Sequence, residues 1–417
     1  MFAWARGEGA GMDLVEVDDL TAGLARFVDS VVVPLEDENA ALLEDHRGAF
    51  YTERGGYSPA VVELIRQTRM ESAKAGYYAM FCPTDIGGGG LSRRMELLTH
   101  EFLARRYGPA RLLPFETVAH WAFGPSFMCS HFSPALRSRL LDDIVGGRVG
   151  MCFGMSEPDA GSDPWMMSTK AVRDGDEWVI TGSKQWTSNG PHADYCYLFA
   201  VTDPTLVRGR RGGISCFVVP MDSPGVSVDS VIKFFGDAGG DEAILSFSEV
   251  RVPEENLVGT EGEGFKLALG GVSVGRVYNS GRALGYSQWA LRQATEYAKS
   301  RVTFGKPIAE HQGVSFKLAD SAMEIYAARH AALDLTARLD RGEVAIRELA
   351  MTKAFCCETM LRVADRAMQV CGAMGLTNET YLYRVWHLAR TLQLADGSSV
   401  ILRQTIVSRL LKGELDF

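Results

Sequence analysis

The chain has 417 residues, of which 46% are hydrophobic and 23% are charged, and its formal net charge is −9. This length predicts roughly two or three domains. The scattered, acidic charge argues against a nucleic-acid-binding surface, and there is no run of about 18 uncharged apolar residues that would predict a membrane-spanning helix.

Residues 1–149 are expected to form an N-terminal helical domain. Leu20, Leu24, Phe27 and Val31 recur at the three- and four-residue spacing of a helix face, and Pro34 should end or bend this helix. The glycine-rich segment 83–90 is expected to be a connector, because no Lys-Ser/Thr pair follows it as in a phosphate-binding loop.

Residues 150–262 are expected to form a middle β domain. The runs 195–201, 214–219 and 243–247 have the composition of strands, and turn sequences such as Asp174-Gly175-Asp176 separate them. The pattern therefore changes from a helical period to a period of two at the start of this region.

Residues 263–417 return to long helical patterns and predict a C-terminal four-helix bundle. Helices are expected from residue 264 onward, over 344–374 and over 400–411. The residues that define the apolar face of another helix are Leu318, Ala322, Ile325, Ala328, Ala332, Leu335 and Leu339. The fold class is thus α+β, in the order helical domain, β domain, helical bundle.

The eight cysteines show no C-x-x-C or Cys/His ligand spacing, and lone histidines such as His120 and His192 have no ligand-spaced partner. We expect buried free thiols in a reducing compartment and no metal site. Acidic residues Glu8, Asp13 and Glu16 and the lack of a hydrophobic core argue against an N-terminal targeting signal, and the final tripeptide is not peroxisomal. A cytoplasmic location is expected.

The most informative segment is 155–163, with the sequence M-S-E-P-D-A-G-S-D. Strand-like runs, 149–153 and 178–182, flank this loop of small and hydroxyl residues. Backbone N–H groups and serine oxygens can approach a flat polar ligand closely in such a loop, because little side-chain bulk intervenes.

Further motifs follow this loop in a fixed order. They are G-S-K-Q-W-T-S-N at 182–189, R-V-T-F-G-K-P-I at 301–308 with Gln312 after it, Q-V-C-G-A-M-G at 369–375, and A-D-G-S at 395–398. Together with the 155–163 loop, they resemble the acyl-CoA dehydrogenase family from about Asp19 to the C-terminus. Ala373 replaces the second Gly of one family motif, and Asp396 replaces the Glu of the family's Glu-Gly-Thr.

The resemblance implies FAD-dependent α,β-dehydrogenation of an acyl thioester to the trans-2-enoyl product. This chemistry needs a carboxylate to take the α-proton, a flavin N5 to accept the β-hydride, and hydrogen bonds to the thioester carbonyl. The resemblance assigns the base to Asp396. Some relatives carry the base just before an Arg on another helix, but here Gly275 precedes Arg276, which favours Asp396.

Asp396 departs from the family in length, since Asp is one methylene shorter than Glu. Its segment, Asp396-Gly397-Ser398-Ser399, could alternatively be the cap of the following helix. A helix N-terminus would lower the pKa of the carboxyl and burial would raise it, and the sequence does not decide between them. Ala395, where many relatives have Tyr, suggests room for a branched or unusually shaped acyl group.

The resemblance also implies the residues that contact the cofactor and the substrate. Those facing the flavin or its ribityl-phosphate arm are Phe153, Met155, Ser156, Gly161, Ser162, Trp186 and Ser188, and Ser398 is expected to contact the cofactor as well. Those reaching the adenosine diphosphate part of a neighbouring subunit's FAD are Arg301, Thr303, Phe304, His311, Gln312, Gln369, Val370, Cys371, Gly372 and Ala373. Ser162 and Arg276 are expected at the substrate, with Arg276 contacting it or orienting the loop that holds Asp396.

The expected partners are an acyl-CoA or acyl-carrier-protein substrate, an electron-transfer flavoprotein as acceptor, and further copies of the chain in a homodimer or homotetramer. A role in fatty acid metabolism follows from the same resemblance. Two alternatives remain open at this stage. One is a flavin-dependent oxidase or monooxygenase of nitroalkane-oxidase type, and the other is a non-catalytic member acting in binding or assembly.

Overall fold

The computed structural model describes residues 14–45, 48–235 and 239–416, and its contacts divide them into two compact units. The helical unit comprises the described residues up to Ala25, Leu91–Phe115 and the residues from Val272 onward. The sheet unit comprises Arg26–Gly90 and Glu116–Gly271, as far as they are described. The bounds expected for the three domains stay a prediction, whereas the expected order of helical, β and helical regions is confirmed.

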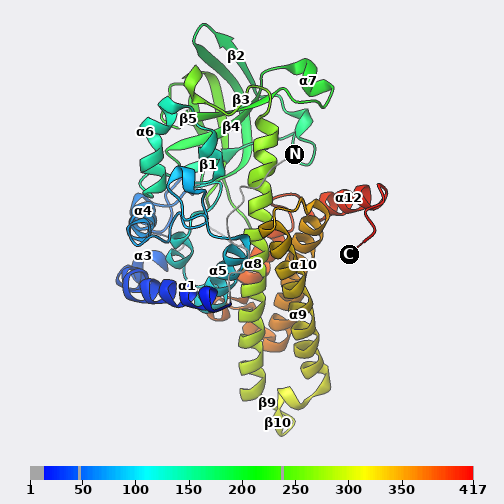
Figure 1. The fold of residues 1–417 in the computed structure, drawn as a ribbon. Coiled ribbons are helices and arrows are strands. Elements are labelled where there is room, and N and C mark those ends of the chain that lie inside the picture. Colours follow the sequence, from blue (N-terminus) through cyan, green and yellow to red (C-terminus); the bar gives the residue numbers. More distant parts are fainter. Residues whose placement is uncertain (1–13, 46–47, 236–238, 417) are drawn as a thin grey trace. The chain divides into compact units, whose positions relative to one another are not determined.

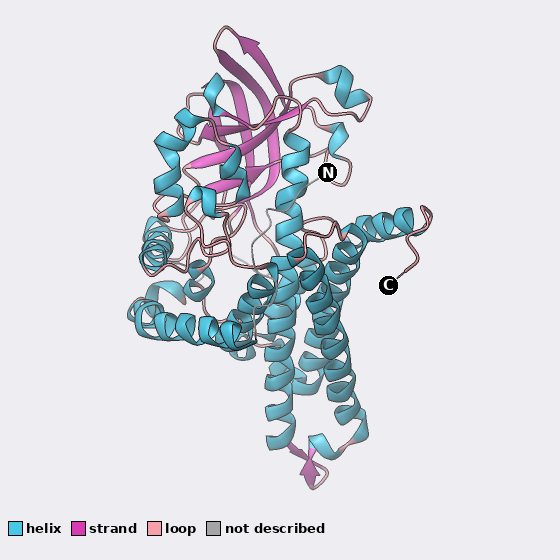
Figure 2. Cartoon of the chain, in the orientation of Figure 1, coloured by secondary structure: helices cyan, strands magenta, loops and turns pink. Residues whose placement is uncertain are grey.

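The sheet unit is built on one eight-stranded sheet, which is coloured magenta in Figure 2. Its path is β6-β7-β3-β2-β4-β5-β8, and β1 pairs in parallel with β4. The strands are β1 (Met151–Gly154), β2 (Lys170–Asp174), β3 (Glu177–Ser188), β4 (Tyr195–Val201), β5 (Ile214–Pro220), β6 (Val226–Ile232), β7 (Glu242–Pro253) and β8 (Leu257–Val258). The three strands expected at 195–201, 214–219 and 243–247 are therefore confirmed.

Both faces of the central strand β4 are buried. Tyr197 and Phe199 pack on one face with residues of helix α6 (Pro134–Val145), while Leu198 packs on the other face against Phe217 and its neighbours. Successive side chains of a strand point to opposite faces, so a continuous apolar run is suited to a sheet covered on both sides. The other helices of this unit are α2 (Val33–Glu38), α3 (Ala40–Leu43), α4 (Pro59–Lys74) and α7 (Pro204–Arg208).

The N-terminal helix differs from the expected pattern in one respect. α1 (Leu14–Phe27) continues through a π-helical turn at Val28–Val32 before α2 begins. Leu24 is buried as expected, but Val31 is exposed and Val28 and Val32 are buried instead. The wider π turn rotates the apolar face relative to an α-helix, and Pro34 then lies in the first turn of α2, where a missing N–H is tolerated.

The helical unit contains α5 (Arg93–Tyr107), most of α8 (Gly264–Ser300), α9 (Gln312–Asp340), α10 (Ile346–Cys371), α11 (Leu382–Leu392) and α12 (Ser399–Leu410). A short hairpin of β9 (Val302–Thr303) and β10 (Lys306–Pro307) joins α8 to α9 (Figure 1). On α9, the expected face is buried at Ile325, Ala328 and Leu335, although Ala322 is exposed. α11, which packs on α10 and precedes the Asp396 loop, was not expected as a separate helix.

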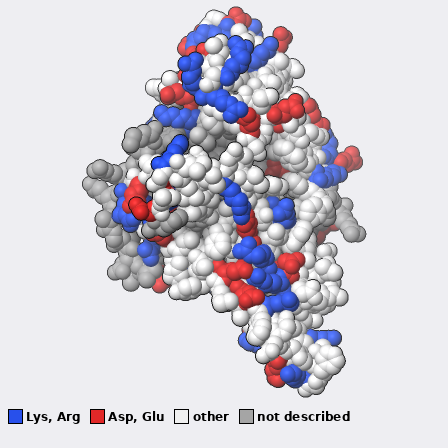
Figure 3. Space-filling model, turned by 90° about the vertical axis from the view of Figure 1, so that its right-hand side faces the viewer, with Lys and Arg blue, Asp and Glu red and all other residues white. Residues whose placement is uncertain are grey.

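Figure 3 shows basic and acidic side chains in several clusters that are separated by uncharged surface. Ion pairs such as those of Glu324 with Arg362 and Arg366 join α9 to α10. All eight cysteines are buried, as expected, and none of them forms a disulfide. Within the described ranges, none of the helices has the length and apolar character required to span a membrane.

Candidate active site

Asp396 lies in the tight loop between α11 and α12. Its backbone φ is +52° and that of Gly397 is +91°, two successive left-handed conformations. Asp tolerates this region better than most residues, and glycine adopts it without strain. Ser398, and not Asp396, is the N-cap of α12, since the Ser398 hydroxyl oxygen accepts from the Ile401 N–H at 3.4 Å. The Asp396 carboxylate is thus not used as a helix cap.

Cationic side chains from two helices hold the backbone of this loop. Lys353 of α10 donates from Nζ to the carbonyl oxygens of Ala395, at 2.7 Å, and Gly397, at 2.9 Å. Arg276 of α8 donates from Nε to the carbonyl oxygen of Asp396 itself, at 3.0 Å. Three consecutive carbonyl groups are therefore bound by charged donors, which are the stronger class of hydrogen bond.

The Asp396 side chain faces α8. Its Oδ2 accepts from Asn279 Nδ2 at 2.7 Å. Burial raises the pKa of Asp396 to about 6, although the charges of Lys353 and Arg276 and the Asn279 hydrogen bond act in the opposite direction. Burial therefore outweighs every stabilising influence on the carboxylate, which answers the question that the sequence left open. A carboxyl with a pKa close to neutral is suited to take a proton and release it again.

The residues on either side of Asp396 carry little or no side-chain bulk. Ala395 is exposed and adds only a methyl group. At Gly397, a Cβ would lie 3.0 Å from Arg276 Nη2. Glycine is thus required here both for its positive φ and for the close approach of the guanidinium group.

The sequence motifs point to Asp396 and Arg276 but not to Asn279 or Lys353. A signal for each was present. Asn279 follows Arg276 by three residues, so both lie on one face of α8. Lys353 interrupts the apolar face of α10, where a buried charge requires partners. Neither signal reveals the partner, because the loop is distant in sequence and its conformation is set by tertiary contacts.

A second candidate loop, at residues 155–163, is anchored by Glu157. The Glu157 carboxylate accepts from the N–H and hydroxyl of Ser168, both at 2.7 Å, and from the Thr169 N–H at 3.0 Å. Lys184 donates from Nζ to Glu157 Oε1 at 2.7 Å and to the Met155 carbonyl at 3.2 Å. The carboxylate therefore ties the loop to both β3 and the segment that leads into β2.

The ion pair between Glu157 and Lys184 is deeply buried, with side chains 3% and 0% exposed. Burial alone would raise the pKa of Glu157, but the Lys184 charge and the hydrogen bonds lower it to about 2. Burial lowers the pKa of Lys184 to about 8 against the opposing effect of Glu157. At neutral pH this carboxylate is ionised and serves the structure of the loop.

A β-bulge in β3 directs Trp186 and Ser188 away from the core. The register between β3 and β7 shifts between Lys184 and Thr187, and Trp186 has a φ of +61°. Thr187 is fully buried, so Trp186 and Ser188 point to the other face, and Trp186 is 52% exposed. An outward-facing tryptophan in a left-handed conformation is a strained arrangement of the kind found at ligand sites.

Ser188 lies opposite Glu242 of β7, and its hydroxyl donates to Glu242 Oε1. Burial, followed by the charge of Asp241, raises the pKa of Glu242 to about 7, although the Ser188 bond lowers it. The Oε2 atom of Glu242 is buried and has no hydrogen-bond partner among the described residues. The Ser188 oxygen and this orphaned oxygen are polar groups that a bound ligand could satisfy.

The remaining residues expected near the flavin lie on the same unit. Phe153 packs edge-on against Trp121, at a ring-centroid distance of 4.9 Å, and Met155 is half-buried beside the same core. The Ser156 carbonyl accepts from the Gln185 N–H at 2.8 Å, while Gly161 and Ser162 are exposed. No atom lies within 4 Å of a Cβ built at Gly161, so the loop offers open backbone to a flat cofactor. These residues fit a flavin.

The residues expected at the adenosine diphosphate gather at one end of the helical bundle. The β9–β10 hairpin brings His311 Nε2 to 3.3 Å from the Thr303 carbonyl and against the ring of Phe304. Phe304 is 96% exposed with a φ of +52°, and Arg301 and Gln312 are exposed. The second set is at the end of α10, with Gln369, Gly372 and Ala373 exposed and Val370 and Cys371 buried.

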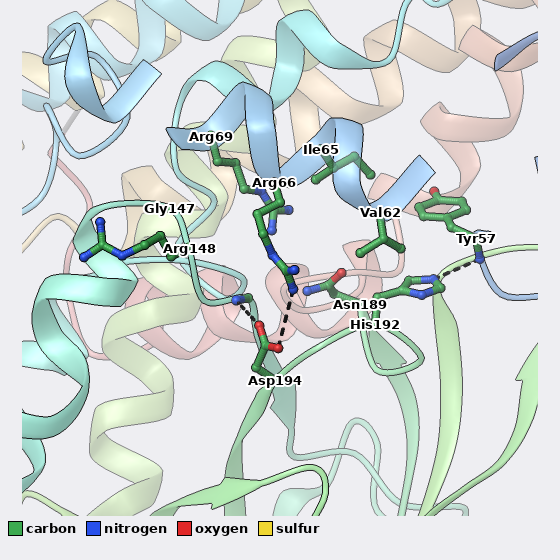
Figure 4. Close-up of a pocket in the computed structure, with 11 residues that line it drawn as sticks. Tyr57, Val62, Ile65, Arg66, Arg69, Gly147, Arg148, Asn189, His192 and Asp194 are labelled. Atoms are coloured by element: carbon green, nitrogen blue, oxygen red, sulfur yellow. Dashed lines mark hydrogen bonds and ion pairs between the residues drawn. The ribbon is translucent and has the colours of Figure 1, made fainter. Parts of the chain in front are cut away.

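A small hollow in the sheet unit, shown in Figure 4, is a different feature. Arg66 Nη2 lies 3.6 Å from Asp194 Oδ1, and Arg69 Nη2 lies 2.7 Å from Glu116 Oε2. His192 accepts from the Tyr57 N–H at 3.1 Å and stacks on its ring. Arg148, which also lines the hollow, is paired with Asp143, so each described charged group of the hollow already has a partner of opposite charge.

Comparison with known proteins identifies relatives of this arrangement. Family models described as acyl-CoA dehydrogenase, middle domain, and acyl-CoA dehydrogenase, C-terminal domain, match residues 152–250 and 262–411. The mitochondrial short-chain specific acyl-CoA dehydrogenase of Mus musculus is 36% identical over 361 residues, which cover 85% of this chain and 86% of that protein. Cyclohexane-1-carbonyl-CoA dehydrogenase of Geobacter metallireducens is 33% identical over 338 residues, covering 81% and 87%. The structure of butyryl-CoA dehydrogenase from Megasphaera elsdenii matches with a TM-score of 0.79 and 28% identity, covering 96% of this chain and 100% of that one.

Proposed function

Because the chain belongs to the acyl-CoA dehydrogenase family, whose members are oxidoreductases acting on CH–CH groups, we propose that it converts an acyl thioester to its trans-2-enoyl product with Asp396 as the base. The observation that carries this proposal is the environment of Asp396. Its carboxyl is held by Asn279 in a loop bound by Lys353 and Arg276, and burial raises its pKa to about 6. A carboxylate that is ionised at neutral pH and only weakly acidic when protonated meets the requirements of a general base.

FAD is the cofactor of this family and supplies the acceptor for the β-hydride. We propose that the 155–163 loop, Trp186 and Ser188 hold its flavin part. The exposed ring of Trp186, the open backbone at Gly161 and the available oxygen of Ser188 support this assignment. Arg276 orients the base loop in the proposal and leaves its remaining guanidinium N–H groups for a substrate oxygen.

The residues at 301–312 and 369–373 serve the FAD of a neighbouring subunit in this proposal. Within the helical unit, Arg276 and the end of α8 are separated by about 35 Å at 1.5 Å per residue, so Asp396 and the hairpin lie at opposite ends of the bundle. The almost fully exposed Phe304 is suited to contact another chain. A homodimer or homotetramer follows from this sharing.

We infer that the site accepts acyl groups that are branched or cyclic near the α-carbon. Asp is one methylene shorter than Glu, and the exposed Ala395 adds little bulk beside it. The relative named for cyclohexane-1-carbonyl-CoA acts on a ring attached at that position, which supports the inference. CoA or a carrier protein would deliver the thioester in a cytoplasmic setting, and an electron-transfer flavoprotein would receive the electrons.

Anaerobic mixing of the FAD-loaded protein with a panel of straight, branched and cyclic acyl-CoAs tests the proposal. Loss of the oxidised-flavin absorbance, with the trans-2-enoyl product identified, is the expected result. Rapid recovery of that absorbance in air would favour the oxidase alternative. A protein that binds FAD but is not bleached by any thioester, on CoA or on a carrier, would favour a binding or assembly role.

A further inference from the structure

Lys353 occupies an unusual position for a charged side chain. It is fully buried, and it lies on the face of α10 that packs in the helical core. Its ammonium group donates to two carbonyl oxygens, those of Ala395 and Gly397, and within the described ranges it forms no ion pair with a carboxylate. A buried cation is costly, and hydrogen bonds to its N–H groups are what make it tolerable.

We propose that Lys353 is a positioning residue for proton transfer, which fixes Asp396 through the carbonyl groups on both of its sides and places a positive charge near its carboxylate without pairing with it. The inference rests on the proposed function of Asp396 as the base. An ammonium group in direct contact with the carboxylate would hold it ionised and make it a poor proton acceptor. Binding the flanking carbonyls instead leaves the carboxylate oxygens to Asn279 and the substrate.

Charged and titratable groups near the Asp396 loop come from α8, α10 and α12. α8 contributes Arg276, which binds the Asp396 carbonyl. α10 contributes Lys353, the thiol of Cys357, whose pKa burial raises to about 11, and Glu358. Glu358 is paired with Arg403 of α12. Since the thiol is neutral and Glu358 is paired, Lys353 and Arg276 are the cations that stabilise the ionised form of Asp396.

Removal of the Lys353 charge should therefore raise the pKa of Asp396 further. A base works only while it is ionised, so the acid limb of kcat/KM should move to higher pH, by on the order of one pH unit. Substitution by arginine keeps the charge but not the compact ammonium geometry. It should leave the acid limb in place and lower kcat, because the carboxylate is displaced.

The experiment measures kcat/KM and kcat against pH for Lys353→Met, Lys353→Gln and Lys353→Arg, with FAD content and thermal unfolding recorded for each. Lys74→Met, on the exposed face of α4, is the control for loss of a lysine charge and should follow the wild type. An infrared titration of the carboxylic C=O band, identified by its loss in Asp396→Asn, gives the pKa of Asp396 independently of turnover.

An upward shift of the acid limb in Lys353→Met or Lys353→Gln, with no shift in Lys353→Arg, supports the inference. The inference would be overturned if Lys353→Met or Lys353→Gln bound FAD and kept the acid limb of kcat/KM at the pH of the wild type. If neither variant binds FAD, Lys353→Arg decides, since an unchanged kcat would also overturn the inference. Should Asp396→Asn bleach the flavin as fast as the wild type, the proposed function itself would fail, and this outcome is distinct from all the others.

Discussion

Two fully buried lysines, Lys184 and Lys353, brace the two candidate loops in different ways. Lys184 is ion-paired with Glu157, and the pKa of this carboxyl is lowered to about 2. Lys353 binds carbonyl groups beside Asp396, and the pKa of that carboxyl is raised to about 6. Both loops gain rigidity from a buried charge, but only the second arrangement leaves a carboxyl that can exchange a proton near neutral pH. A buried lysine that contacts the carboxylate directly thus holds it ionised as a structural acid, whereas one that binds neighbouring carbonyl groups leaves the acid able to react.

The largest loss of stability is expected when the buried ion pair between Glu157 and Lys184 in the sheet unit is broken. Lys184→Met leaves the Glu157 carboxylate buried without its cation, which typically costs about 3–5 kcal/mol. Thermal unfolding should move to a markedly lower temperature, and FAD should be lost. The double variant Lys184→Met/Glu157→Gln removes both charges and should be less destabilised than Lys184→Met alone, and the opposite order would contradict the role given to this pair.

Two glycines sharpen the comparison between the loops. Gly397→Ala introduces a Cβ at a φ of +91° and 3.0 Å from Arg276, so we expect a loss of about 1–2 kcal/mol and at least roughly tenfold slower flavin bleaching. Gly161→Ala meets nothing within 4 Å and should leave the stability of the apoprotein unchanged while weakening FAD binding. If both variants changed the stability of the apoprotein equally, the proposed difference between the packed Gly397 and the open Gly161 would be contradicted.

Asn279→Ala should change the pKa of Asp396, the reactive carboxyl, and leave the pKa of Glu157, the structural one, unchanged. The amide donates to Asp396 Oδ2 and lowers the pKa of Asp396, so its removal should raise that pKa by on the order of one pH unit. The acid limb of kcat/KM would move upward while thermal unfolding changes little. Asn189→Ala, whose amide binds the Met151 carbonyl in the sheet unit, should show no such shift of the limb.

A moderate fall in pH should protonate Asp396 but not Glu157, and this is the smallest of the expected effects. Glu157 has a lowered pKa, so its contribution to stability is present above the ordinary value of 4.5 and disappears as the pH falls toward about 2. Asp396 has a raised pKa, so it takes up its proton near pH 6. Activity should therefore fall reversibly around pH 6 while circular dichroism stays native, and coincident loss of both would contradict the distinction.

The sequence was sufficient where local pattern determines structure. The period-two runs predicted β4, β5 and β7, and the helical spacing predicted α9 and α10, because each pattern reflects which faces are buried. It failed at Val31, where the π-helical turn moved the apolar face, and at α11, which is short. Local propensity contains little information about such deviations, since packing decides them.

For the candidate site, motifs located Asp396, Arg276, Trp186 and the 155–163 loop. They could not show that Ser398 rather than Asp396 caps α12, because both are good capping residues. Nor could they reveal that Lys353 binds the Asp396 loop, since a contact between residues more than 40 positions apart leaves no local signal. The balance between burial and charge that sets the pKa of Asp396 depends on that same tertiary arrangement.

The most direct test of the account compares wild type and Asp396→Asn in anaerobic flavin bleaching by the best acyl-CoA of the panel. Asn keeps the size and the loop hydrogen bonds but cannot accept the proton. We expect Asp396→Asn to bind FAD and acyl-CoA like the wild type and to bleach several orders of magnitude more slowly. Bleaching at the wild-type rate would show that another group removes the proton, and Asp396 would not be the base.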